Sequence, residues 1–263
     1  MSEHEFADFP VAWTYHRNSS RWAHNAAGGA GDELPEPGKE SPLLPYTRLP
    51  APRPAATALA ELMHARCSCR CFNGTEIALA AIATVLHASY GVTGTSRFGA
   101  SEFLERPVPS GGGLYALELY LIANRVAGLS AGIHHYVPVH HGLEEVREVS
   151  VPRHLLRYLF MGQDAAASAQ AIVVIGGDTA RCLKKYGDRG YRYLLLEAGH
   201  VAQQLNLAAL AVGLQTLNVG GFFDDELAAL CRMTPVREVP LYAVAVGAAD
   251  TADRTGLRFP DEA

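Results

Sequence analysis

The most constraining feature of this chain is an apolar seam that begins near Tyr191 and ends near Val212. Its members recur at alternating steps of four and three residues, which is the spacing of one face of a helix that packs on another helix. They are Leu194, Ala198, Val201, Leu205, Ala208 and Val212. Because glycine costs about 1 kcal/mol relative to alanine inside a helix, Gly199 indicates that another backbone comes close, from a second subunit or from the same chain.

Strand patterns lie on both sides of this predicted helix. They are the runs "LELYLIA" (117–123), "AIVVIGG" (171–177), "LQTLNVGG" (214–221) and "LYAVAVG" (241–247). Helical spacing covers 55–66 and 75–91, the second with Thr75 as N-cap and Gly91 as a stop. A hairpin is expected to turn at His140 to Gly142. Since single βα units do not alternate, the order predicts an α+β fold with a mixed sheet.

The chain divides by composition into three parts. Residues 27–54 are dense in Pro and Gly and predict an extended arm or linker, preceded by a small ordered segment at 13–22. We therefore expect an N-terminal segment and arm over 1–54, one folded domain over 55–250 and a tail over 251–263. The 263 residues give such a domain room for a real core.

Charge and cysteine usage argue against several functional classes. The formal net charge is -5 and no basic stripe is present, so nucleic acid is not an expected partner. Neither a signal peptide nor a membrane-spanning run is visible, and no membrane association is expected. The five cysteines form an odd set without an export signal, which indicates reduced thiols and a cytoplasmic location.

The stretch "ARCSCRCF" places Arg66, Ser68 and Arg70 at alternate positions. Two guanidinium groups that flank a hydroxyl can grip a phosphate dianion, because their planar donors match its oxygens. An exposed strand with outward arginines is the alternative. A metal site on Cys67, Cys69 and Cys71 ranks below the phosphate interpretation, since no fourth ligand is apparent. No metal is expected.

The stretch "PSGGGLYALELY" would let a flat ligand approach the backbone, because its glycines carry no Cβ. The loop residues are Pro109, Ser110, Gly111, Gly112 and Gly113. A strand follows the glycines where a dinucleotide fingerprint would require a helix, so that fingerprint is excluded. A merely flexible loop remains the alternative.

In "NVGGFFDDELAAL", Gly220 and Gly221 follow a predicted strand and precede a helix that Asp224 or Asp225 could cap. Amides at such a turn can face a ligand atom that gains negative charge. An ordinary strand-to-helix turn would show the same pattern.

The stretch "KKYGDRGYRY" sets Lys184, Lys185 and Tyr186 before the long helix, as a proton-transfer pair or as a solvated turn. Glu197 and His200 are expected to form a helix-face pair with a satisfied core histidine. Cys182 is expected to be a small buried residue. Four histidines around the predicted hairpin are interpreted as loop polarity: His134, His135, His140 and His141.

In this order, these stretches resemble the SagB-type dehydrogenases of the flavin nitroreductase superfamily, which include the oxidases of thiazole and oxazole biosynthesis. The resemblance covers about residues 60–247 and extends more weakly to "YHRNSS" near the start. It implies a nitroreductase-like fold, a central sheet flanked by helices, and a homodimer with the long helix at its interface. It also implies two FMN sites at that interface.

The resemblance also implies roles for individual residues. The segment with Arg66, Cys67, Ser68 and Arg70 matches the phosphate-and-ribityl motif, and Pro109, Ser110 and Gly111 to Gly113 match the flavin-contacting loop. Gly220 and Gly221 match a turn whose amides face the flavin near N5. Lys185 and Tyr186 match a catalytic lysine-tyrosine pair. Cys67 and Cys69 depart from the basic and apolar residues common in relatives, and the C-terminal tail offers only Arg254 and Arg258 as further basic residues.

The function implied is oxidation of an azoline ring to an azole, with hydride transfer to flavin N5 and proton removal by Lys185 or Tyr186. The expected substrate is a modified peptide or a carrier-bound intermediate, and the expected partners are a cyclodehydratase or a peptide synthetase. Two alternatives remain open: an NAD(P)H-dependent nitro or quinone reductase, and a flavin-poor scaffold of a biosynthetic complex.

Overall fold

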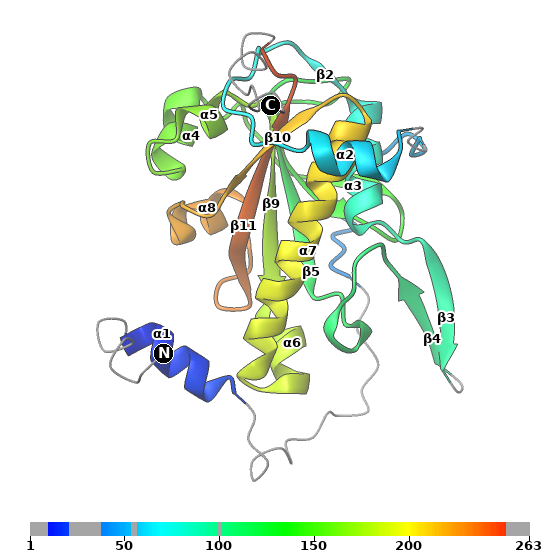
Figure 1. Ribbon diagram of the computed structural model, residues 1–263, viewed down its shortest axis with the longest axis vertical. Helices are drawn as coiled ribbons and strands as arrows, with labels where there is room; N and C mark the ends of the chain where they lie inside the picture. Colours follow the sequence, from blue (N-terminus) through cyan, green and yellow to red (C-terminus); the bar gives the residue numbers. More distant parts are fainter. Residues whose placement is uncertain (1–9, 21–37, 54–56, 99–100, 251–263) are drawn as a thin grey trace, which may run out of the picture.

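The computed structural model describes residues 10–20, 38–53, 57–98 and 101–250. A seven-stranded sheet forms its centre, and the long helix α7 (Arg189–Ala211) runs along one face of it (Figure 1). The strands follow in the order β1 (Tyr46–Arg48), β8 (Gly142–Glu148), β7 (Gly132–Val137), β5 (Leu117–Ala123), β9 (Ala171–Asp178), β11 (Glu238–Gly247) and β10 (Gln215–Val219).

The α+β class is confirmed, but the direction of pairing differs from the mixed sheet that we expected. All six strand pairs of the central sheet are antiparallel. In an antiparallel pair each strand starts at the end of the sheet where its partner finishes, so a short turn can join neighbours such as β7 and β8. Within the described ranges, β2 (Ile77–Ala78) and β6 (Val126–Ala127) pair in parallel outside this sheet, and Ser68 forms an isolated parallel bridge with Thr216 of β10. A separate hairpin joins β3 (Gly94–Phe98) and β4 (Ser101–Glu105).

Two hydrophobic cores fill the two faces of the sheet. One core packs α3 (Leu79–Tyr90) and α7 against strand residues such as Leu119 and Val173. The other packs three short helices against the alternate residues of the same strands, such as Tyr120 and Val174. These helices are α4 (Arg153–Leu159), α5 (Asp164–Ser168) and α8 (Asp224–Leu230). The nearly continuous apolar strands follow from burial on both faces.

The long helix confirms the seam prediction within two residues at either end. Leu194, Val201 and Leu205 are fully buried in the core shared with α3. Gly199, however, is exposed, and nothing in the described chain lies within 4 Å of a Cβ built on it. A close crossing within the same chain is therefore wrong as the explanation of this glycine. Contact with a second subunit stays a prediction.

The N-terminal region makes specific contacts where the structure describes it. Tyr46–Arg48 pairs with β8 and so extends the sheet. The helix α1 (Pro10–Asn18) lies beside the start of α7, where Arg189 Nη1 donates to the carbonyl oxygen of Ser19 at 2.9 Å. The expected ordered segment is thus confirmed over residues 10–20. The boundaries of the three parts stay predictions, and Arg254 and Arg258 lie outside the described residues.

Two helix starts differ from the prediction. Helix α3 begins at Leu79 rather than near Thr75, because the backbone of Ile77 and Ala78 pairs with β6. The Thr75 hydroxyl donates to Asn73 Oδ1 at 2.8 Å and caps no helix. Asp224 and Asp225 occupy the first turn of α8, whose N-cap is Phe223. Their carboxylates there favour the positive end of the helix dipole. Helix α2 (Leu59–Ala65) confirms the other predicted helix over a shorter span.

The interpretation of His134 and His135 as loop polarity is wrong. Both lie in β7 and are 1% exposed. His135 is held between Glu118 and Glu144, with ring nitrogens 2.9 Å and 3.1 Å from their carboxylate oxygens. The turn itself covers residues 138–141, close to the predicted position. Among the helices that the structure describes, none is long and apolar enough to cross a membrane.

Candidate functional site

Helix α6 (Thr179–Tyr186) carries the lysine-tyrosine pair and is anchored at its N-terminus. Asp178 caps it by accepting the backbone N–H of Arg181 at 3.1 Å. The Arg181 guanidinium donates to Glu118 at 3.0 Å and to the carbonyl oxygen of Tyr115 at 2.9 Å. Since Tyr115 lies two residues after Gly113, this arginine links α6 to the end of the glycine loop.

The pair lies where α6 ends and the chain turns into α7. Gly187 adopts φ +56, a conformation that other residues rarely take. The Lys185 ammonium lies 5.7 Å from the ring centre of Tyr186. The Tyr186 ring packs edge-on against Tyr193 of α7, with centroids 4.9 Å apart. Lys184 is exposed. Cys182 is buried as predicted.

The glycine loop packs directly against this pair. Gly111–Gly113 forms one 3-10 turn, in which Gly112 has φ +63. A Cβ built on Gly112 would overlap the Tyr186 hydroxyl and come within 3.0 Å of Lys185 Nζ. A Cβ on Gly111 would lie 3.2 Å from the Tyr193 ring. Two stretches that are far apart in sequence thus meet, which places the backbone of the loop beside a phenol and an amine.

Ser110 of the glycine loop binds a buried carboxylate, and its expected place in a flavin-contacting loop stays a prediction. Its hydroxyl donates to Glu197 at 2.6 Å and accepts the backbone N–H of Tyr115 at 2.9 Å. Glu197 is 4% exposed and also accepts the Tyr90 hydroxyl, whereas His200 is exposed. The expected pairing of Glu197 with His200 as a satisfied core histidine is therefore wrong, because the two side chains face core and solvent respectively.

Sequence reasoning missed the role of Glu197, although a signal was present. Glu197 lies three residues after Leu194 and four before Val201, on the buried seam of the helix. A charge on a buried face requires hydrogen-bond partners. No comparable signal pointed to Tyr90.

The arginine-rich stretch lies near the other end of α7. Ser68 pairs with Thr216 of β10, and the backbone N–H of Cys69 donates to the Thr216 carbonyl at 2.8 Å. Arg66 and Arg70 are exposed, while Cys69 is buried and Cys67 is partly buried. In the described chain no three His, Cys, Asp or Glu residues are grouped to hold a metal. The alternation of outward arginines and an inward cysteine fits a strand-like segment docked on β10.

The glycine pair follows the opposite end of β10. A Cβ on Gly220 would lie 3.7 Å from the Tyr242 ring, and one on Gly221 would lie 3.4 Å from Gln163 Nε2. Asn218, two residues earlier, has a buried Oδ1 with no donor in the described structure. Its neighbours in β10, Leu217 and Val219, pack on the core opposite α7, so Asn218 points to the α7 side. A buried carbonyl oxygen without a donor is suited to a ligand that supplies one.

The predicted site residues therefore form two groups within one chain. Arg66 to Arg70 and the glycine pair share the edge strand β10. The glycine loop precedes β5, with β9 and β11 between it and β10, and joins Lys185 and Tyr186 near the N-terminal end of α7 (Figure 1). A helix of 23 residues spans about 34 Å at 1.5 Å per residue, which measures the separation of its two ends.

Comparison with known proteins identifies the family. The model described as Nitroreductase family matches residues 63–248. This chain belongs to the nitroreductase family. MJ1384 of Methanocaldococcus jannaschii, which carries a nitroreductase name, is 33% identical over 189 residues, covering 72% of this chain and 90% of MJ1384. The family model and the fold together make this chain a nitroreductase-family oxidoreductase.

Proteins that process peptides are also similar to this chain. McbC of Escherichia coli, named a microcin B17-processing protein, is 30% identical over 143 residues, which are 52% of this chain and 52% of McbC. The chain thus spans about half the length of McbC. A chain in the E. coli microcin synthetase McbBCD complex, solved with truncated pro-MccB17 bound, superposes with a TM-score of 0.61 at 21% identity. That match covers 95% of this chain and 98% of the other, and it shows the fold.

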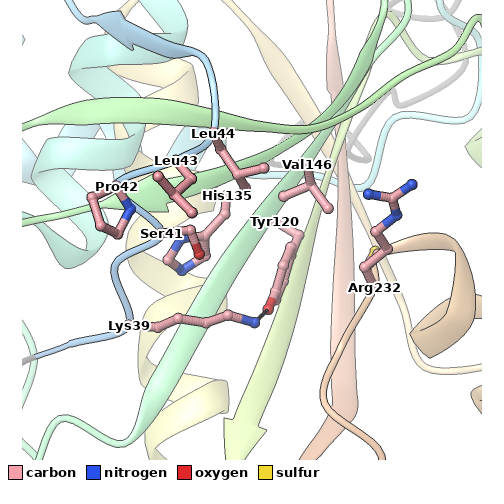
Figure 2. A pocket seen from close by; sticks show the side chains of 10 residues that line it. Lys39, Ser41, Pro42, Leu43, Leu44, Tyr120, His135, Val146 and Arg232 are labelled. Atoms are coloured by element: carbon pink, nitrogen blue, oxygen red, sulfur yellow. Dashed lines mark hydrogen bonds between the residues drawn. The ribbon is translucent and has the colours of Figure 1, made fainter.

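A pocket of about 380 Å³ lies on the sheet face opposite α7 (Figure 2). Tyr120, His135 and Val146 line its floor, and Leu44 and Arg232 stand at its sides. The Lys39 ammonium reaches into it and donates to the Tyr120 hydroxyl at 2.8 Å. In this nitroreductase-family chain, the pocket holds none of the residues that sequence reasoning assigned to the site.

Proposed function

We propose that this chain is an FMN-dependent dehydrogenase that oxidises thiazoline or oxazoline rings to thiazole or oxazole in peptide natural-product biosynthesis. One observation carries the proposal: the Tyr186 hydroxyl and the Lys185 ammonium lie against Gly112 of the glycine loop. This arrangement puts groups that can transfer a proton beside a backbone that a flat ligand can approach. The similarity to the microcin-processing protein McbC supports a peptide-derived substrate.

The residues present fit FMN. Arg66 is exposed and makes no ion pair in the described chain, so its guanidinium is available to a phosphate beside Ser68 and Arg70. The buried Asn218 Oδ1 lacks a donor, and FMN offers hydroxyl and ring N–H donors. Gly220 and Gly221 would present backbone to the ring. Bound FMN would supply the redox chemistry by accepting a hydride at N5.

We further propose that two copies of this chain complete each site. The residues proposed to hold the phosphate and those proposed to move the proton lie near opposite ends of α7 in one chain. A two-fold pairing through α7 would bring the glycine loop of one protomer toward β10 of its partner. Gly199, exposed on this helix without a neighbour in the described chain, would allow the close approach.

In this site Lys185 and Tyr186 would take the proton. Conversion of an azoline to an azole removes a hydride from one ring carbon and a proton from the adjacent carbon. One member of the pair, as the tyrosinate or as the neutral amine, accepts that proton, and the other adjusts the basicity of the first through its charge or hydrogen bonding. Tyr193 holds the Tyr186 ring from the α7 side, with centroids 4.9 Å apart.

A single-turnover experiment tests this function. Protein loaded with FMN is mixed without oxygen with a synthetic thiazoline-containing peptide, and flavin bleaching and product mass are followed. We expect one azole for each FMN reduced. Lys185→Ala or Tyr186→Phe should slow bleaching by about 100-fold or more, the usual scale for a lost acid or base. Lys184→Ala, the exposed neighbour, is the matched control.

Two results would contradict the assignment. Turnover of the azoline at the parent rate by both variants, with FMN still bound, would exclude Lys185 and Tyr186 as the base. Purified protein that takes up no FMN, yet co-elutes with a cyclodehydratase, would favour the flavin-poor scaffold.

A nitro or quinone reductase is the second candidate, and the similarity to MJ1384 favours it. Such an enzyme would draw electrons from NAD(P)H. Rapid bleaching of the bound flavin by NADPH, followed by quinone turnover, would support it over the azoline oxidase. Slow bleaching by NADPH with fast bleaching by the thiazoline peptide would support the oxidase.

The partners follow from the proposed substrate. Either a modified ribosomal peptide or a carrier-bound intermediate would deliver the azoline, and a cyclodehydratase or a peptide synthetase would form it. The microcin synthetase complex, solved with a truncated precursor bound, supports a multi-protein assembly. None of the five cysteines forms a disulfide in the described chain, which fits the reducing cytoplasm where we place these proteins.

A further inference from the structure

We propose that Glu197 is a positioning residue that locks the glycine loop beside Lys185 and Tyr186. Its carboxylate orients two hydroxyl groups, and each of these holds one end of the segment between Ser110 and Leu117. The inference rests on the proposed function only where it takes this loop to face FMN.

The lock joins three separate elements. The Ser110 hydroxyl of the loop donates to Glu197 Oε2 at 2.6 Å, and the Tyr90 hydroxyl of α3 donates to Oε1 at 2.8 Å. Glu197 itself lies in α7 and is 4% exposed, while Tyr90 is fully buried. Both carboxylate oxygens thus have a donor, one from the loop and one from α3.

The two hydroxyls also bind the backbone of the loop. Ser110 Oγ accepts the N–H of Tyr115 at 2.9 Å, and Tyr90 Oη accepts the N–H of Leu117 at 3.0 Å. An ionised carboxylate can only accept hydrogen bonds. Each hydroxyl proton must therefore point to Glu197, which leaves the oxygen lone pairs to face the two amides. The charge of one side chain sets the direction of four hydrogen bonds.

Burial raises the pKa of Glu197, while hydrogen bonds from Ser110 and Tyr90 and the charges of Arg106 and Arg181 act against that rise. No cation of the described chain forms a contact ion pair with this carboxylate. The buried acid is thus costly to the fold. A hydrophobic residue would fill the seam at lower cost, so the lock itself explains the acid.

The loop transmits the lock to the candidate catalytic pair. Gly112 lies two residues after Ser110. Its α-carbon packs so closely against the Tyr186 hydroxyl and Lys185 Nζ that a Cβ has no room. If Ser110 were released, Gly112 would lose its fixed place against Tyr186. The carboxylate oxygens of Glu197 bind Tyr90 and Ser110, so Glu197 acts on the pair through the loop.

The experiment compares Glu197→Ala, Glu197→Gln and Ser110→Ala with His200→Ala, an exposed residue of the same helix, as control. The first measurement is hydrogen exchange of residues 107–117 without FMN. We expect Glu197→Ala and Ser110→Ala to speed exchange about tenfold, because each variant removes a hydrogen bond to a charged group that holds the loop. Glu197→Gln keeps one acceptor and should lie between parent and Glu197→Ala. His200→Ala should match the parent.

The second measurement is FMN affinity and the visible circular dichroism of the bound flavin. Glu197→Ala and Ser110→Ala should each weaken FMN about tenfold, and the double variant should be no worse than either alone, since both remove one shared interaction. Visible dichroism that changes in these variants but not in His200→Ala would show a shifted loop, which a general loss of stability would not produce.

Parent-like exchange of residues 107–117 in folded Glu197→Ala would overturn the lock. If Glu197→Ala does not fold, Ser110→Ala and Glu197→Gln, which nearly preserve the packed volume, decide by the same readout. Failure of the proposed function would be a separate result. Parent protein that binds no FMN or does not oxidise azolines would contradict that function. The exchange data without FMN would still test the lock.

Discussion

The two faces of the sheet differ in the partners of their buried charged and amide side chains. On the face opposite α7, charged side chains form ion pairs, Glu118 with Arg181 at 3.0 Å and Lys39 with Glu238 at 2.8 Å. On the α7 side, Glu197 has no contact ion pair and Asn218 Oδ1 has no donor in the described chain. Paired charges stabilise the fold, whereas a buried acid without a contact cation and an acceptor without a donor indicate positions that serve function.

The largest expected effect comes from breaking the paired face. Glu118→Ala would leave Arg181 and His135 buried without their shared carboxylate. Loss of one partner of a buried charge pair costs about 3–5 kcal/mol. Urea denaturation should show this loss in the free energy of unfolding, with Glu226→Ala at an exposed acid as control. A loss below about 1 kcal/mol would contradict the structural role of the pairing.

The next effect tests the contact between the glycine loop and the candidate catalytic pair. Gly112 and Gly113 have φ +63 and +65, so alanine is strained at both, but only a Cβ on Gly112 meets Tyr186 and Lys185. Gly112→Ala should therefore destabilise the protein by about 1–3 kcal/mol more than Gly113→Ala, the range for overpacking. Denaturation of both variants measures the difference. Equal losses would place Tyr186 away from the loop in solution.

A smaller effect distinguishes Asn206, whose side-chain oxygen has a hydrogen-bond donor, from Asn218, whose side-chain oxygen has none in the described chain. Asn206 accepts the Thr216 hydroxyl at 2.8 Å, so Asn206→Ala should cost about 1–3 kcal/mol by leaving that hydroxyl without a partner. Asn218→Ala should cost less than about 1 kcal/mol, because it removes an acceptor that had no donor. It should instead weaken FMN about tenfold, as loss of about 1.4 kcal/mol would. Unchanged FMN affinity in Asn218→Ala would remove this residue from the proposed site.

The smallest effect is the pH dependence of a single histidine. Burial alone would lower the pKa of His135, but hydrogen bonds to Glu118 and Glu144 outweigh it and raise the pKa. A raised pKa means that the folded state binds the proton more tightly, so this stabilisation is complete below the unfolded value near 6.5 and is lost as pH rises through the folded value. His135→Gln should flatten the fall in unfolding free energy as pH rises above about 6.5. A fall of the same slope in the variant would assign it to other groups.

Sequence reasoning was most accurate for elements whose own residues repeat with the period of a helix or a strand. The apolar seam predicted the long helix within two residues, and the strand-forming runs located β5, β9, β10 and β11. The local sequence pattern gave wrong predictions where contacts with residues distant in the sequence determine the structure. Ile77 and Ala78 form a strand because they pair with the backbone of β6. His135 lies in the core because its two ring nitrogens are hydrogen-bonded to the carboxylates of Glu118 and Glu144.

For the candidate site, the motifs supplied the residue types but not their grouping. The proximity of Lys185 and Tyr186 to Gly112 joins stretches more than seventy residues apart. The engagement of Ser110 by Glu197 depends on the rotation of α7, which sequence spacing only suggested.

Periodicity, turn chemistry and the ordered motifs by themselves determined the class of the fold, the long helix and the family resemblance. These signals are local, since helix and strand geometry repeat every few residues. The tertiary structure alone decided the antiparallel pairing, the division of site residues between two ends of α7, and the partners of Glu197 and Asn218. Such features depend on which distant groups meet in the packed chain, and burial makes a polar group's partners matter because no water can replace them.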